Sequence, residues 1–95
     1  MTTATFALPA VLTHARAAAT AQDLLRAVQA NRQLAIDASA LQQFDSSALA
    51  VLLAGLRSAS EHGGRVTVQA LPSRAANLAR VYGLADLLDL SAPSV

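Results

Sequence analysis

A strand–helix–strand pattern between Leu34 and Ala70 restricts the fold more than any other feature of the sequence. A short apolar run, Leu34 to Asp37, and a β-branched run, Val66 to Ala70, both have strand length. Between them an apolar helix is expected to begin near Ser46 and to end at Gly63-Gly64, where glycine suits a helix C-terminus. A unit of this length is expected to be a right-handed crossover between parallel strands. The pattern therefore predicts an α/β domain.

The residues before this unit predict two short strands and a helix. Residues 3–12 read TATFALPAVL, and Pro9 cannot donate to a sheet ladder, so we expect two short strands separated by a turn. Residues 13–30 are rich in alanine, with larger apolar residues at helical spacing. Thr13, Ala18 and Thr20 each fit the start of this amphipathic helix.

The residues after the unit predict two further helices. Residues 73–83 carry apolar side chains on one helical face and end at Gly83, a candidate left-handed cap. The leucines at positions 84, 87, 88 and 90 predict one short final helix. Together the segments predict a single α/β domain over residues 1–95, with a mixed β-sheet and flanking α-helices.

Composition excludes several classes of function. The chain of 95 residues is 54% hydrophobic and 14% charged, with no cysteine. Its longest nearly uncharged stretch, Ala48 to Leu56, is far shorter than the roughly 20 residues of a membrane span, so no direct membrane insertion is expected. Residues 1–12 lack the basic start of a signal peptide, which favours a cytoplasmic protein. The seven basic residues are dispersed arginines and the net charge is +1, so nucleic acid is not an expected partner.

The helix after Ser46 has two distinct apolar faces. At 100° per residue, one face carries Leu49, Leu52, Leu53 and Leu56 and is expected to pack on the sheet. The opposite face carries small, uncharged residues, which we call the small-residue strip: Ser47, Val51, Ala54, Gly55 and Ser58. Such a surface allows close approach of another protein. The alternative is that the helix over residues 13–30, or the C-terminal segment, covers this strip.

Three polar residues, Asp45, Ser46 and Ser47, precede or begin the same helix. Asp45 and Ser46 are both preferred N-cap types, and the negative charge of Asp45 complements the helix dipole. Capping leaves Ser47 without a structural role. A phosphate on Ser47 would be stabilised by the helix N-terminus and would lie beside Asp45, so it would alter partner binding more than folding.

Other reactive side chains have structural explanations. Asp37 ends a strand and can accept hydrogen bonds from the turn near Ser39. His14 and His62 have no second ligand at metal spacing, and no phosphate-binding loop or nucleophile elbow is present, so no catalytic residue, metal or cofactor is expected. Tyr82 is interpreted as a core residue whose hydroxyl reaches the surface.

These residues resemble the STAS domain over Phe6 to Leu88. The resemblance rests on a strand ending in Asp37, a turn, the run Phe44-Asp45-Ser46-Ser47-Ala48-Leu49, an apolar helix, Gly63-Gly64 and a second strand. STAS domains occur in anti-sigma-factor antagonists, in sulfate-transporter tails and in a small subunit of Mla-type phospholipid-trafficking ABC transporters. Ala48 stands where the antagonist and Mla-type branches usually have glycine.

The two branches imply different partners. The antagonist motif is Asp-Ser-Ser-Gly-Leu, in which a serine kinase that also holds a sigma factor modifies the second serine, here Ser47. The Mla-type motif resembles Asp-Thr-small-Gly-Leu, in which the threonine, here Ser46, matters for docking on the ATPase. The short N-terminal strands and the segment from Asn77 to Leu84 are closer to the Mla-type branch.

The resemblance therefore implies a non-catalytic accessory subunit, peripheral to the inner membrane through its complex and concerned with outer-membrane lipid asymmetry. Asp45 would order the start of the helix and Ser46 would make the polar contact. Ser47, Val51, Ala54 and Ser58 would supply the docking face.

Overall fold

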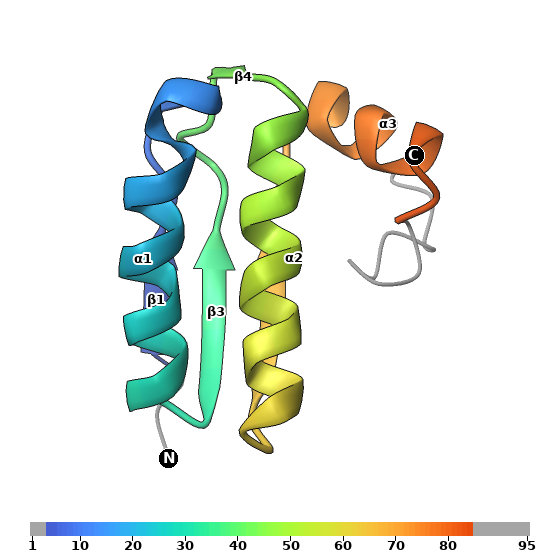
Figure 1. The fold of residues 1–95 in the computed structure, drawn as a ribbon. Coiled ribbons are helices and arrows are strands. Elements are labelled where there is room, and N and C mark those ends of the chain that lie inside the picture. Colours follow the sequence, from blue (N-terminus) through green and yellow to red (C-terminus); the bar gives the residue numbers. More distant parts are fainter. Residues whose placement is uncertain (1–3, 85–95) are drawn as a thin grey trace.

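The computed structural model describes residues 4–84 and contains two small parallel sheets and three helices (Figure 1). In chain order the elements are β1 (Ala4–Ala7), β2 (Val11–Leu12), α1 (His14–Ala30), β3 (Gln33–Asp37), β4 (Gln43–Phe44), α2 (Ser46–Glu61), β5 (Arg65–Gln69) and α3 (Ser73–Val81). The α/β architecture is confirmed. The short final helix expected after Gly83 falls mainly on residues 85–95, which are not among the described residues.

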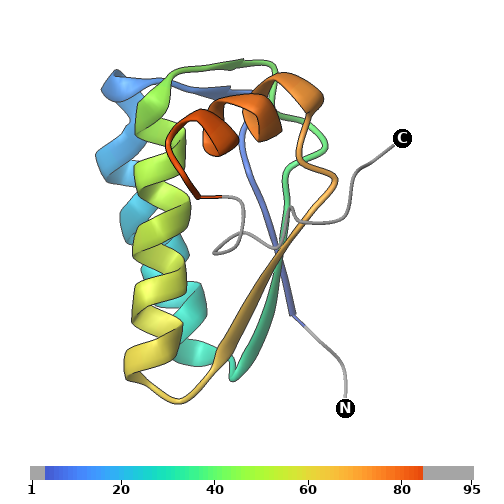
Figure 2. The same cartoon turned by 90° about the vertical axis from the view of Figure 1, so that its right-hand side faces the viewer.

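The main sheet has the order β1-β3-β5, with Ala4 opposite Leu34 and Leu34 opposite Val66. Both crossovers move across the sheet in the same direction, and right-handed connections then place α1 and α2 on the same face. Figure 2 shows both helices on one side of the strands. All pairings within residues 4–84 are parallel, so the antiparallel pairing that a mixed sheet would include is not found in this part of the chain.

The hydrophobic core lies between this sheet and the two helices. On β3, Leu34 and Ile36 point toward the helices and are 2% and 0% exposed. The alternate residue Gln33 is exposed on the other face, as the two-residue period of a strand requires. The largest fully buried side chains are Leu8, Leu12, Leu24, Leu34, Ile36 and Leu52.

A second pair of strands positions the starts of α1 and α2. β2 and β4 are two residues long each, and their parallel pairing places Val11 opposite Gln43 and Leu12 opposite Phe44. Each short strand is followed after one residue by a helix. The pairing of β2 with β4 therefore brings the N-termini of α1 and α2 side by side at the carboxyl end of the main sheet (Figure 1).

The small-residue strip is covered by α1, so the expectation that it forms a free docking face is wrong. Val51 and Ser58 are 2% and 7% exposed, Gly55 is buried and Ala54 is half-buried. A methyl group added at Gly55 would come within 2.7 Å of the Leu24 side chain of α1. The alternative in which the helix over residues 13–30 covers the strip is confirmed, because small residues allow the two helices to approach closely.

The predicted start of α1 and the predicted end of α3 are confirmed, but the predicted burial of Tyr82 is not. Helix α1 begins at His14, directly after Thr13, which agrees with the earliest of the three expected starts. Gly83 has a φ of 74°, so the left-handed conformation expected after α3 is confirmed. Tyr82, however, is 57% exposed, and its interpretation as a core residue is wrong because the buried face of α3 consists of Ala75, Ala76 and Ala79.

Candidate functional site

The carboxylate of Asp45 connects the N-termini of two helices. Its Oδ1 accepts a hydrogen bond from the Ser47 backbone N–H at 2.8 Å, which confirms Asp45 as the N-cap of α2. Its Oδ2 accepts a second bond, from the backbone N–H of His14 at 3.1 Å. The Thr13 side chain makes no capping bond to α1, so Asp45 satisfies an N–H group that its own helix leaves unpaired. The sequence pattern indicated only the first of these two bonds.

These contacts set the charge state of Asp45. The hydrogen bond from the Ser47 backbone N–H is the largest influence and lowers the pKa of Asp45 from its ordinary value of 3.8. Partial desolvation opposes this shift, while the His14 N–H, the Ser47 hydroxyl and the charge of the His14 imidazole reinforce it. The carboxylate is therefore ionised at neutral pH and complements the positive ends of both helix dipoles.

Asp37 has a comparable but more local role. Its Oδ1 accepts a hydrogen bond from the Ser39 backbone N–H at 2.9 Å, which confirms the turn expected after the strand. This backbone bond, followed by one from the Ser39 hydroxyl, lowers the pKa of Asp37. Both carboxylates at this end of the sheet therefore accept hydrogen bonds from their own chain.

Acid is expected to destabilise the domain through these two carboxylates. A lowered folded-state pKa means that each group stabilises the fold when pH is above its ordinary value of 3.8, and that this stability is lost as pH falls below it. The urea midpoint should therefore drop between pH 6 and pH 3. Asp45→Asn should reduce this pH dependence more than the matched variant Asp37→Asn, because Asp45 caps two helices. Identical pH profiles for Asp45→Asn and the unmodified protein would contradict this role.

The two serines at the start of α2 have different surroundings. Ser46 is exposed and belongs to an apolar hollow between α2 and the residues directly after α3, which we call the α2–α3 groove. Ser47 is half-buried and its backbone is bonded to Asp45. The residues that line the groove are Ser46, Leu49, Ala50, Leu53, Tyr82 and Leu84.

The sequence pattern did not identify this groove. It assigned Leu53 to the stripe facing the sheet and Tyr82 to the core, whereas Leu53 is half-buried and Tyr82 is exposed. The available signal was the absence of charge on α2 before Arg57. This signal indicates a helix that is uncharged around most of its circumference, but it does not indicate which positions pack within the chain.

A family model described as "Mlab, STAS domain" matches residues 2–89. The chain belongs to this STAS domain family. The resemblance inferred from the Asp45-Ser46-Ser47 region is thereby confirmed, with an anti-sigma-factor-antagonist-like fold. Membership supports a regulatory or accessory role, and STAS domains are generally non-catalytic. No curated protein matches the sequence.

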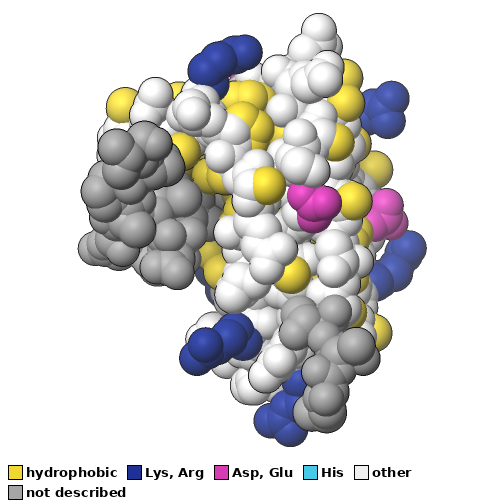
Figure 3. Space-filling model, turned by 180° about the vertical axis from the view of Figure 1, so that it is seen from behind, with side chains coloured by type: hydrophobic (Ala, Val, Ile, Leu, Met, Phe, Trp, Pro, Cys, Tyr) yellow, Lys and Arg dark blue, Asp and Glu magenta, His cyan; other side chains and the backbone are white. Residues whose placement is uncertain are grey.

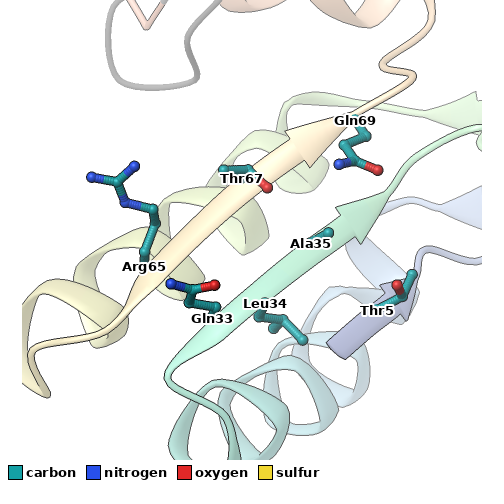
Figure 4. Close-up of a pocket in the computed structure, with 7 residues that line it drawn as sticks. All are labelled: Thr5, Gln33, Leu34, Ala35, Arg65, Thr67 and Gln69. Atoms are coloured by element: carbon teal, nitrogen blue, oxygen red, sulfur yellow. The ribbon is translucent and has the colours of Figure 1, made fainter. Parts of the chain in front are cut away.

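The STAS domain has a second, polar hollow on the face of the sheet opposite α1 and α2. Figure 4 shows that Gln33, Arg65, Thr67 and Gln69 project from β3 and β5, with Thr5 on β1. Where this face is visible from behind, hydrophobic side chains are interrupted by polar and backbone atoms (Figure 3). The hollow brings together amides, hydroxyls and one guanidinium, without the paired carboxylates that acid–base chemistry would use.

The described part of the STAS domain contains neither a metal-binding cluster nor a membrane-spanning helix. Residues 4–84 contain no group of three or more His, Cys, Asp or Glu side chains placed to hold a metal ion. Among the same residues, no helix combines the length and the apolar character needed to cross a membrane.

Proposed function

We propose that this STAS domain is a non-catalytic accessory subunit that docks on the ATPase of an Mla-type phospholipid-trafficking ABC transporter. The observation that carries the proposal is an uncharged surface formed by the exposed residues Ser46, Ala50 and Tyr82 and the half-buried Leu53. On this proposal the protein is cytoplasmic and reaches the inner membrane only through its partner.

The α2–α3 groove has the composition of a protein interface. Its centre is apolar, and Tyr82 offers a large amphipathic side chain of the type enriched in binding hot spots. Ser46 adds one hydroxyl that can hydrogen-bond to a partner at the edge of the groove. Asp45 fixes the backbone next to Ser46, so little conformational freedom is lost on binding.

The set of docking residues differs from the one expected from sequence. Asp45 and Ser46 remain, the first as a support and the second as a contact. Val51, Ala54 and Ser58 are no longer proposed as contacts, because α1 covers the small-residue strip. Ala50 and Leu53 take their place in the proposed docking surface. Ser47 lies beside the contact surface and is held by Asp45.

A phosphorylation switch of the anti-sigma-factor-antagonist type is the second candidate. The supporting observation is the contact of Ser47 with Asp45, whose carboxylate also binds the start of α1. A phosphoryl group on Ser47 would repel that carboxylate and weaken the connection between the two helices. Modification would thereby alter the surface around Ser46.

Titration calorimetry with the Mla-type ATPase subunit of the same source tests the proposal. We expect the unmodified protein to bind, with Ser46→Tyr weakening binding by about 10-fold or more because the bulky ring blocks the edge of the groove. Binding of a serine kinase instead, lost once Ser47 carries a phosphate seen as a mass increase of about 80 Da, would support the switch. No binding by the unmodified protein would exclude the transporter assignment.

A further inference from the structure

Helix α3 and Phe44 of β4 together form a second surface, whose lining residues differ from those of the α2–α3 groove. We call it the α3 ridge. It consists of Phe44, Arg74, Asn77, Leu78, Arg80 and Val81, five of which line one hollow, while Arg80 is connected to the set through Asn77. Val81 is 81% exposed, more than Tyr82 or Val11. The ridge therefore combines cationic and apolar side chains.

Arg74 is held in a defined position on this ridge. Its guanidinium carbon lies 5.2 Å from the centre of the Phe44 ring, a cation–π contact that orients the side chain. The contact occupies one face of the guanidinium and leaves its N–H groups at the edge for other acceptors. An oriented guanidinium loses less entropy when it binds a carboxylate.

The stability of α3 does not explain the position of Arg74. The first turn of a helix favours acidic side chains, yet α3 has none there and carries Arg74 instead. Arg80 suits the last turn, where its Nη1 donates to Asn77 Oδ1 at 2.9 Å. Asp37 and Asp45, which lie at this end of the sheet, both accept hydrogen bonds from backbone groups. Among residues 4–84 no carboxylate pairs with Arg74, so within this part of the chain its charge is available for another contact.

We infer that the α3 ridge binds an acidic, amphipathic segment of a partner protein. A carboxylate would pair with the edge of Arg74 and an apolar side chain would cover Leu78 and Val81, which matches the charge and the polarity of the ridge. An anionic membrane also attracts arginines, but each contributes only about 1 kcal/mol there, and two arginines make a weak membrane anchor. The inference goes beyond the proposed function and does not depend on an ATPase partner.

The test is an NMR titration of the isotope-labelled full chain with three probes. They are a short peptide of alternating leucine and glutamate pairs, its lysine counterpart, and vesicles containing phosphatidylglycerol. We expect the acidic peptide to shift the amide signals of Phe44, Arg74 and Val81 and to bind about 10-fold more tightly than the basic one. Equal binding of both peptides, no binding of the acidic peptide, or stronger binding to the vesicles would overturn the inference.

Charge-reversal variants locate the contact. Arg74→Glu places an acid in the first turn of α3, where it suits the helix dipole, so the fold is retained. The variant should weaken binding of the acidic peptide by about 10-fold through lost attraction and added repulsion. Arg26→Glu is the matched control, because Arg26 lies on α1, 3.5 Å from Asp23. An equal loss in both variants would indicate a general effect of net charge and contradict the assignment.

A competing occupant is supplied by the chain itself. Residues 85–95 include Asp86 and Asp89 among leucines, which is the same chemistry as the acidic peptide. The titration is therefore repeated on the variant Asp86→Asn/Asp89→Asn. Unchanged affinity supports a separate partner, whereas clearly tighter peptide binding would assign the α3 ridge to the chain's own segment.

Discussion

Val51→Lys is expected to unfold the STAS domain. Val51 is 2% exposed on the face of α2 that packs against α1, where Gly55 and Leu24 already approach closely. A lysine there would bury an unpaired charge or force the two helices apart, at a cost of about 4 kcal/mol or more. That cost is a large part of the roughly 5–15 kcal/mol by which a domain is stable. Urea denaturation followed by circular dichroism should show the loss.

The same substitution one residue away provides the control. Ala50 is exposed on the other side of the helix, so Ala50→Lys should leave the urea midpoint nearly unchanged. A Val51→Lys protein as stable as the Ala50→Lys protein would show that α1 does not cover this face. The small-residue strip would then again be available to a partner.

Ala50→Lys is expected to abolish docking on the ATPase while the fold is retained. Ala50 lies in the α2–α3 groove between Ser46 and Leu53, and a lysine there would lose its hydration in the interface without a counter-charge. Truncation or mispairing of a buried interfacial charge costs about 2–5 kcal/mol, so we expect affinity to fall by about 100-fold. Calorimetry against the same ATPase subunit measures this loss.

Ala18→Lys is the matched control for that measurement. Ala18 is exposed on α1, so the variant has the same change in volume and charge on another helix. It should bind the ATPase like the unmodified protein. If Ala18→Lys weakened docking and Ala50→Lys did not, the partner surface would lie on α1 and the proposed groove would be excluded.

The sequence predicted the elements of the fold more reliably than their packing. The strand–helix–strand unit, the N-cap at Asp45 and the left-handed Gly83 are local features, each determined by residues close in sequence. They were confirmed for that reason. The bond from Asp45 to His14 joins residues 31 positions apart, and no local pattern encodes it.

The position of the candidate site could likewise not be predicted from local sequence patterns alone. Helical periodicity correctly separated Val51 and Ser58 from Leu49 and Leu52, but both faces are apolar, so the pattern did not indicate which neighbour covers each face. The alanine-rich α1 covers the face of α2 that carries Val51 and Ser58, because small residues on both helices permit close packing. Ala50 and Leu53 are left at the surface, next to Ser46. The location of the groove follows from helix packing and not from the Asp45-Ser46-Ser47 motif alone.

The strand order β1-β3-β5 also has a consequence for how the chain folds. Within residues 4–84 the strands of the main sheet lie side by side in the order in which they occur along the chain. None of these strands must therefore be inserted between two that are already paired. β1, α1 and β3 complete one unit, and α2 and β5 then extend its free edge. During synthesis the sheet can therefore grow from the N-terminus as residues leave the ribosome, with little need to rearrange contacts already made.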